Sequence, residues 1–213
     1  MPHRSDHRTR VGARRRARTE ERILEAALRV FAAKRSGAPV IDDFIKAASI
    51  ARGTFYNYFR STDELFDATA AWLLDDLRQS VDDALEGITD PVLRIGMGIR
   101  LALRKAEQDR AWAAFMSQFL HFEPLTGART TDRELKRGLR LKQLHAPSAH
   151  AAADLLVGTW RQAMERLASH PELSGYGDSV AAIVLQGLGA DPGSIQEMLD
   201  RPLPQVRATR TIA

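Results

Sequence analysis

The chain has 213 residues, no cysteine and a formal net charge of +4. The lack of cysteine excludes disulfides, thiolate metal ligands and thiol redox sensing. No apolar run approaches the roughly 20 residues that a membrane-spanning helix needs, and no signal-peptide core follows the start, so we expect a cytoplasmic protein with no membrane anchor.

The positive charge is concentrated in the first quarter of the chain. Residues 1–60 hold 14 lysines or arginines and six acidic residues, a net charge of +8, and the remaining residues carry −4. This asymmetry is typical of a protein in which one region docks on DNA and another does not. The alternative is a solvated basic segment with no partner.

Residues 1–18 hold seven arginines and one aspartate and show no apolar periodicity. We therefore expect a disordered arm. A transit peptide is also rich in arginine, but this segment has no apolar face that would make it amphipathic. We favour the interpretation that residues 1–18 form an arm that binds DNA.

Three short helices are predicted next. The first begins at Thr19, a capping residue, and ends near residues 35–37. The second follows Pro39, and a break at residues 49–51 separates it from a third helix over residues 52–59. Two short helices joined by such a break, with a supporting first helix, form a helix-turn-helix, here at about residues 40–59.

The helix over residues 52–59 is too polar for a core helix. Phe55 and Phe59 lie four residues apart and define one apolar edge, which leaves the arginine, amide and phenol groups on other faces. Such groups suit base edges and phosphate oxygens, so nucleic acid is the expected partner. Ser61 and Glu64 then have the spacing of a capping box that starts a fourth helix.

Residues 19–66 resemble the DNA-binding domain of the TetR (tetracycline repressor) family of bacterial transcriptional regulators. The resemblance rests on residues spread over all four predicted helices, namely Ile23-Leu24, Ala26-Ala27, Phe31, Asp43-Phe44, Ala47-Ala48, Gly53-Thr54-Phe55-Tyr56, Phe59 and Asp63-Glu64-Leu65. It implies an all-α fold with a three-helix DNA-binding head over residues 19–66. A helical ligand-binding and dimerisation domain over residues 67–201 and a tail over residues 202–213 would follow.

Several residues depart from the family pattern. Arg35 and Ser49 replace glycines that the family commonly has after the first helix and in the turn. A non-glycine residue at positive φ costs about 1 kcal/mol unless the turn is reshaped. Val40, Ala51 and Thr62 stand where the family commonly has capping or phosphate-binding side chains. We therefore expect the recognition face to survive with fewer phosphate anchors than usual, and the arginine-rich arm to supply the lost affinity.

The resemblance implies roles for individual residues in DNA binding. Arg52, Thr54 and Asn57 are expected to reach base edges, because arginine pairs with guanine and asparagine with adenine in the major groove. Gly53 would allow close approach to DNA, although clearance for helix packing is the alternative. Phosphate contacts are expected from the remaining members of the set, Arg18, Thr19, Arg22, Tyr56, Tyr58 and Arg60, with surface packing as the alternative for each tyrosine.

The rest of the chain reads as helices over residues 62–86, 91–109, 111–122, 148–169, 178–188 and 191–200, with a loop and a short helix before Leu144. Large rings recur at helical spacing in the third of these. They form either a core stripe or the wall of an apolar ligand pocket. The pocket reading comprises Trp72, Met97, Trp112, Phe115, Met116, Phe119 and His121.

The last two long helices would pair with those of a second copy. The resemblance implies a two-fold dimer, with an intramolecular core as the alternative. The expected interface residues are Leu156, Trp160, Ala163, Leu167, Ile183 and Val184.

The function expected from this reading is ligand-sensitive repression. A homodimer would bind a palindromic DNA operator, and a small, largely apolar effector would release it. A constitutive, non-specific DNA-binding protein is the alternative. The spacing of the polar residues indicates no enzyme, no cofactor and no metal site.

Overall fold

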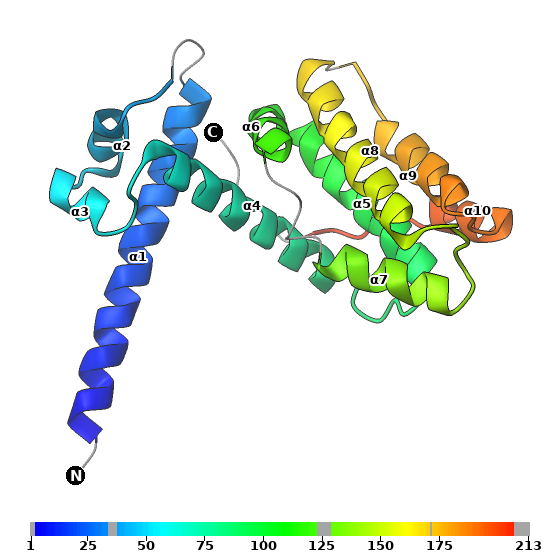
Figure 1. Cartoon of the computed structure of the whole chain (residues 1–213), viewed down its shortest axis with the longest axis horizontal. Coiled ribbons are helices and arrows are strands. Elements are labelled where there is room, and N and C mark those ends of the chain that lie inside the picture. The colour runs from blue at the N-terminus through cyan, green and yellow to red at the C-terminus, as the bar shows by residue number, and fades with distance from the viewer. Residues whose placement is uncertain (1–2, 34–37, 123–128, 171, 207–213) are drawn as a thin grey trace. The chain divides into compact units, whose positions relative to one another are not determined.

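The computed structural model describes residues 3–33, 38–122, 129–170 and 172–206 (Figure 1). Every regular element in these ranges is a helix, which confirms the expected all-α class. The chain divides into two compact units between Trp72 and Leu73, rather than after residue 66. The boundary lies later because α4, Thr62–Ala84, is a single continuous helix whose start packs in the first unit.

The first unit contains α1 (His3–Ala33), α2 (Ile41–Ala48), α3 (Arg52–Tyr56) and the start of α4. Its core is built from apolar side chains that the sequence spaces at helical intervals. Phe44, Phe55 and Phe59 are buried, and the ring of Phe31 lies 5.2 Å from those of both Phe44 and Phe66. The other core members are Ile23, Leu24, Ala26, Ala27, Ala48 and Leu65.

The arginine-rich segment differs from the expected disordered arm. Residues 3–18 are the first half of α1 and run without a break into its packed second half. Arginine and alanine are good helix formers, and no proline interrupts α1. Apolar periodicity marks the face of a helix that packs against other elements. Because residues 12–18 are exposed, the spacing of apolar residues could not indicate this part of the helix.

The second unit comprises α5 (Pro91–Gln108), α6 (Arg110–Phe122), α7 (Arg129–Arg140), α8 (Ala149–Ser169), α9 (Tyr176–Gly187) and α10 (Pro192–Asp200), together with the end of α4. Helix α5 is central, because α6, α7, α8, α9 and α10 all pack against it (Figure 1). Gly96 permits the close approach of α10: a Cβ there would lie 2.6 Å from Cγ of Met198.

Side-chain caps fix the starts of α5 and α10. The carboxylate of Asp90 accepts from the backbone N–H of Leu93 at 2.9 Å, and Asp191 does the same for Gly193 at 2.8 Å. A proline follows each of these aspartates at the first helical position, where its fixed φ suits the helix and its missing N–H costs nothing. None of the described helices is both long and apolar enough to cross a membrane.

Candidate nucleic-acid interface

Helix α3 separates its apolar and polar residues cleanly. Phe55 is 0% exposed and Phe59 is 4% exposed, so the predicted aromatic pair anchors the segment to the core. Arg52, Gly53 and Asn57 are exposed on the outer side. The regular helix ends at Tyr56 rather than residue 59, and the turn continues through N–H groups of residues 57–59 that still bond to carbonyls of the helix. A short polar helix with a buried base can therefore present side chains to an external partner.

Gly53 serves no packing purpose inside the protein. A Cβ built on Gly53 would meet no atom within 4 Å. Because glycine weakens a helix by about 0.5–1 kcal/mol relative to alanine, its presence here is not explained by folding. Within the described residues, Gly53 therefore provides no clearance for helix packing. Its other predicted role, to allow close approach of an outside molecule, is the one that remains.

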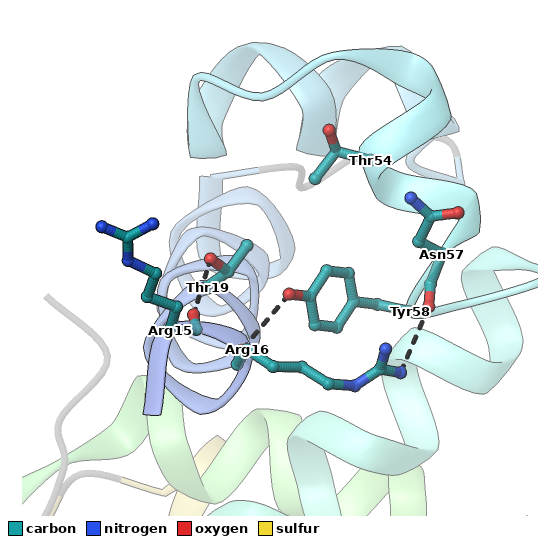
Figure 2. A pocket seen from close by; sticks show the side chains of 6 residues that line it. All are labelled: Arg15, Arg16, Thr19, Thr54, Asn57 and Tyr58. Atoms are coloured by element: carbon teal, nitrogen blue, oxygen red, sulfur yellow. Dashed lines mark hydrogen bonds between the residues drawn. The ribbon is translucent and has the colours of Figure 1, made fainter. Parts of the chain in front are cut away.

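Helix α1 contacts the end of α3 through Arg16 (Figure 2). The guanidinium of Arg16 lies 4.9 Å from the ring centroid of Tyr58 and donates to the backbone carbonyl of Asn57 at 3.3 Å. In return, the Tyr58 hydroxyl donates to the carbonyl of Arg16 at 3.3 Å. Tyr58 is half-buried and thus joins two helices, which fits the packing role that was the alternative to a phosphate contact.

An open groove runs between these two helices. It has a volume of about 420 Å³ and is lined by Arg15, Arg16, Thr19, Thr54, Asn57 and Tyr58. Four of these residues were predicted DNA contacts, and the structure brings them together from α1 and α3 (Figure 2). The spacing of residues along the chain does not indicate that Arg15 and Arg16 line this groove, because residues about 40 positions apart meet only in the folded chain.

Three of the other predicted phosphate-binding or base-reading arginines have partners within the protein. Arg22 donates to the carbonyl of Ala48 at 3.0 Å and so caps the end of α2. Arg52 lies 2.5 Å from the carboxylate of Asp42, but both side chains are more than half exposed. An exposed ion pair contributes only about 0–1 kcal/mol, so Arg52 can exchange this partner for a base or a phosphate at little cost.

Arg60 forms the third such pair, with Glu64 at the start of α4. Its backbone N–H and its guanidinium both donate to the Glu64 carboxylate, at 2.7 and 3.1 Å. These two bonds lower the pKa of Glu64 from its usual value. Only half of the predicted capping box forms: Ser61 accepts from the N–H of Glu64 at 3.1 Å, while the Glu64 carboxylate turns to Arg60.

The structure bears out the altered turn chemistry of the head. Ser49 has φ 52° and ψ 52°, the left-handed conformation that glycine adopts without cost. Val40 and Ala51 occupy the N-cap positions of α2 and α3, and neither side chain can accept a hydrogen bond. At α2, Asp43 compensates in part by accepting from the N–H of Val40 at 2.8 Å. Arg35 lies outside the described residues.

The predicted pocket residues of the second unit are core residues. Met97, Trp112, Phe115 and Met116 are each at most 5% exposed, as the core-stripe reading requires. Trp72 instead packs against the core of the first unit. The side chains of Phe119 and His121 lie outside the described part of the structure.

An ion pair beside Trp112 was missed by sequence reasoning. The ammonium of Lys105 lies 2.9 Å from the Asp109 carboxylate and 5.9 Å from the Trp112 ring centroid, and both charged residues are at most 9% exposed. Asp109 also accepts from the backbone N–H of Trp112 at 3.0 Å and so caps α6. The spacing of four residues between a lysine near the end of α5 and the aspartate that follows α5 could have indicated this ion pair.

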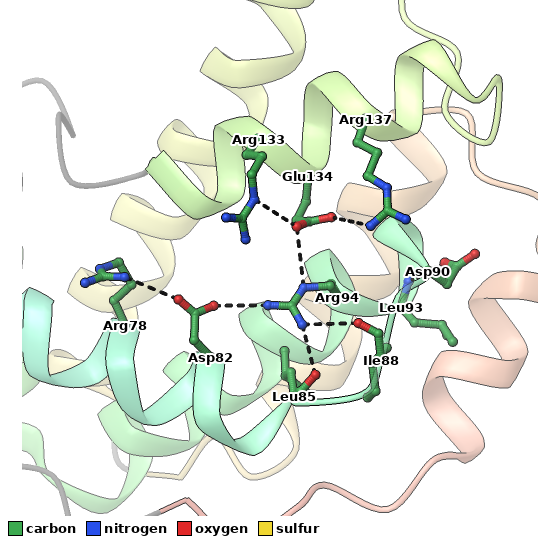
Figure 3. Close-up of polar contacts among 10 residues, drawn as sticks. All are labelled: Arg78, Asp82, Leu85, Ile88, Asp90, Leu93, Arg94, Arg133, Glu134 and Arg137. Atoms are coloured by element: carbon green, nitrogen blue, oxygen red, sulfur yellow. Dashed lines mark hydrogen bonds and ion pairs between the residues drawn. The ribbon is translucent and has the colours of Figure 1, made fainter.

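Arg94 of α5 ties the end of α4 to α5 and α7 (Figure 3). Its guanidinium donates to the carbonyls of Leu85 and Ile88 at 2.9 and 3.2 Å and lies 3.1 Å from the Asp82 carboxylate. Its Nε lies 3.5 Å from the carboxylate of Glu134, which is 5% exposed on α7. One largely buried side chain thus holds three elements together.

Most of the predicted dimer residues are buried within the chain itself. Leu156, Ala163, Leu167 and Val184 are each at most 6% exposed, so in this conformation they are not accessible to a second copy. Apolar periodicity marks the buried face of a helix without saying whether the cover comes from the same chain. Ile183 is 67% exposed and Trp160 is half-buried, and these two remain available.

Comparison with known proteins supports the resemblance seen in the sequence. Residues 23–69, which cover the core of the first unit, match the model for bacterial regulatory proteins of the tetR family. This match places a tetR-type DNA-binding domain in the first unit. Two HTH-type transcriptional regulators of Bacillus subtilis are similar in sequence: YhgD is 38% identical over 64 residues and YvdT is 39% identical over 70. These alignments span only 34% and 36% of the two relatives.

Solved structures extend the likeness in fold to both units of the chain. RolR without ligand has a TM-score of 0.70 at 22% identity, with 88% of this chain and 100% of RolR covered. RolR has also been solved with resorcinol, at a TM-score of 0.67. FadR from Bacillus subtilis, in complex with stearoyl-CoA, has a TM-score of 0.65 at 15% identity, with 78% of this chain and 98% of FadR covered. At these identities the match shows the fold alone.

Proposed function

We propose that this TetR-family chain is a transcriptional regulator that binds a palindromic operator as a homodimer through α3. The observation that carries the proposal is the outer side of α3. Exposed Arg52 and Asn57 lie on either side of Gly53, where an added Cβ would meet no atom of the described chain within 4 Å, and two buried phenylalanines hold the helix in place. Arginine and asparagine can each make two hydrogen bonds to a base in the major groove.

The dimer is expected to form on the outer face of α8 and α9. Ile183 on α9 and Leu155 on α8 are large apolar side chains left 67% and 37% exposed. Gly158 on α8 and Gly187 on α9 are exposed as well, and small residues let helices approach closely. This surface replaces the buried residues of the sequence-based interface. A two-fold dimer would place two copies of α3 in successive major grooves, about 34–36 Å apart.

The effector is expected to act on the second unit. RolR has been solved with resorcinol and FadR with stearoyl-CoA, so small molecules with apolar parts are the compounds to test first. Met97 and Met116 have flexible thioether side chains, which can rearrange around a guest more readily than branched ones. Lys105 and Asp109 would supply the polar contacts of a site that is otherwise apolar and aromatic.

Arg94 gives such a ligand a route to α4. A ligand that displaced α5 or α7 would change the contacts of Arg94 with Asp82 and with the carbonyls of Leu85 and Ile88. Because α4 continues into the first unit, those contacts couple the second unit to the DNA-binding head. Couplings of this kind typically amount to about 1–3 kcal/mol.

The proposal is tested by selecting fragments of the source genome that the purified full chain binds. A palindromic site with half-sites about one helical turn apart is expected, and Asn57→Ala should abolish the preference for it over scrambled DNA. Compounds of the two chemical classes above are then added to the complex, and release of the DNA is measured. Equal affinity for selected and scrambled fragments would favour the alternative, a non-specific DNA-binding protein.

A further inference from the structure

The N-terminal half of α1 extends beyond the part of the helix that packs in the core. The first core side chain of α1 is Ile23, whereas residues 12–18 are all exposed. A helix of this length gains little stability by itself in water, since most helical stability in proteins comes from packing an apolar face. The extension has no such face, so its helical state calls for another source of stabilisation.

The charges of the extension make that requirement stronger. Arg14, Arg18 and Arg22 recur every four residues and therefore lie along one side of α1. Like charges at this spacing destabilise a helix by about 0.2–0.5 kcal/mol per pair. Arginines on one side of a helix repel each other. An anionic surface stabilises such a helix because it neutralises several of the arginines at once.

Arg16 fixes the direction of the extension relative to α3. It stacks on Tyr58 and donates to the carbonyl of Asn57, while the Tyr58 hydroxyl bonds back to the Arg16 carbonyl. The groove so formed is lined by Arg15 and Thr19 on one side and by Thr54 and Asn57 on the other (Figure 2). The extension and the predicted base-reading residues therefore border one continuous surface.

We infer that the helical extension of α1 is a second DNA-binding element, which binds phosphates of the duplex next to the bases read by α3. The occupant is the DNA backbone, because it alone in the proposed function supplies a regular row of negative charges opposite the exposed Arg14, Arg15 and Arg18. Arg16 is a positioning residue that holds the extension against α3. The inference rests on the proposed DNA-binding function and adds a separate contact to it.

The test compares full-length variants by fluorescence anisotropy on a selected operator duplex and on a scrambled duplex, between 50 and 200 mM KCl. The variant Arg14→Gln, Arg15→Gln, Arg18→Gln removes three charges from the extension. A matched control, Arg29→Gln, Arg140→Gln, Lys142→Gln, removes three exposed charges elsewhere. Circular dichroism and thermal unfolding verify that both variants retain a folded second unit.

The extension variant should lose affinity for both duplexes by the same factor and keep its preference for the operator. Each lost phosphate contact lowers the salt slope by about 0.9, so three lost contacts lower it by about 2.7 for one bound protomer and by about 5.4 for a dimer with both extensions on the DNA. The affinity advantage of the wild type should then shrink about 40-fold per bound protomer between 50 and 200 mM salt. If the extension variant instead matched the control in affinity and slope, the inference would be overturned while operator preference, and with it the proposed function, stood.

The role of Arg16 is tested by a double-mutant cycle. Arg16→Lys keeps the charge but loses the planar stacking and the paired donors of the guanidinium. It should weaken DNA binding in the wild-type background and have little effect when Arg14, Arg15 and Arg18 are already glutamine, because nothing remains to be positioned. Equal losses in both backgrounds would overturn the positioning role. A wild type with no operator preference but a steep salt slope would refute base reading by α3 and leave the extension contact standing.

Discussion

Replacement of Gly53 by alanine should have opposite effects on folding and on DNA binding. The added Cβ meets no atom of the described residues within 4 Å, and alanine is favoured over glycine in a helix by about 0.5–1 kcal/mol. The free energy of unfolding should therefore stay the same or rise by up to about 1 kcal/mol. On DNA the same methyl group would hold α3 away from the groove and weaken the hydrogen bonds of its neighbours.

The expected loss of affinity follows from those hydrogen bonds. A bidentate pair from Arg52 or Asn57 to a base contributes about 1–3 kcal/mol, so loss of one pair lowers operator affinity about 5-fold to 150-fold. Thermal unfolding and anisotropy titration on the same protein samples measure the two effects. Gly98 of α5 provides the control, since it is a helical glycine of the second unit where an added Cβ would come no closer than 3.9 Å to the side chain of Val81, and Gly98→Ala should not weaken binding. Unchanged operator affinity for Gly53→Ala would refute the close approach of α3 to DNA.

Four further outcomes follow from the structure. Val40→Thr should stabilise the first unit by about 1 kcal/mol in thermal unfolding, because threonine can cap α2 and valine cannot; Val40→Ala, which adds no cap, should not. Arg94→Met should destabilise the second unit by about 3 kcal/mol in urea unfolding, because Asp82 and Glu134 would lose a buried partner, and an effect below 1 kcal/mol would contradict the clamp. The pKa of Glu64 is lowered in the folded chain, so the stability that Glu64 contributes should be present above its usual pKa of 4.5 and lost as the pH falls through its folded pKa. In Glu64→Gln, the free energy of unfolding should fall less steeply over this acid range. Ile183→Asp should yield monomers in analytical ultracentrifugation if α9 forms the dimer face, and a dimer that persisted would exclude this face.

The sequence predicted local structure well wherever one helix carries its own signals. Phe55 and Phe59 mark the buried edge of the predicted recognition helix by their spacing alone, and Pro91 and Asp191-Pro192 mark the starts of α5 and α10. Caps and aromatic pairs act over one turn, so the information needed lies within a few residues. The family resemblance supplied the arrangement of these helices in the head.

Contacts between distant residues could not be predicted in the same way. Apolar stripes on α8 and α9 suggested a dimer interface, yet Leu156 and Leu167 pack within the chain and Ile183 is the side chain left exposed. The absence of an apolar stripe suggested disorder at residues 3–18, yet this segment is helical. In both cases periodicity reports that a helix face is covered or bare, and it does not identify the element that covers it.

The sequence by itself determined the helical class, the polar outer face of α3 and the basic charge of the first quarter of the chain. Only the tertiary structure decided which arginines share a surface with α3. It places Arg16 against Tyr58, 42 residues away, and thereby joins the extension of α1 to the recognition helix. Composition and spacing are properties of a chain segment, whereas a binding surface is assembled from segments that folding alone brings together.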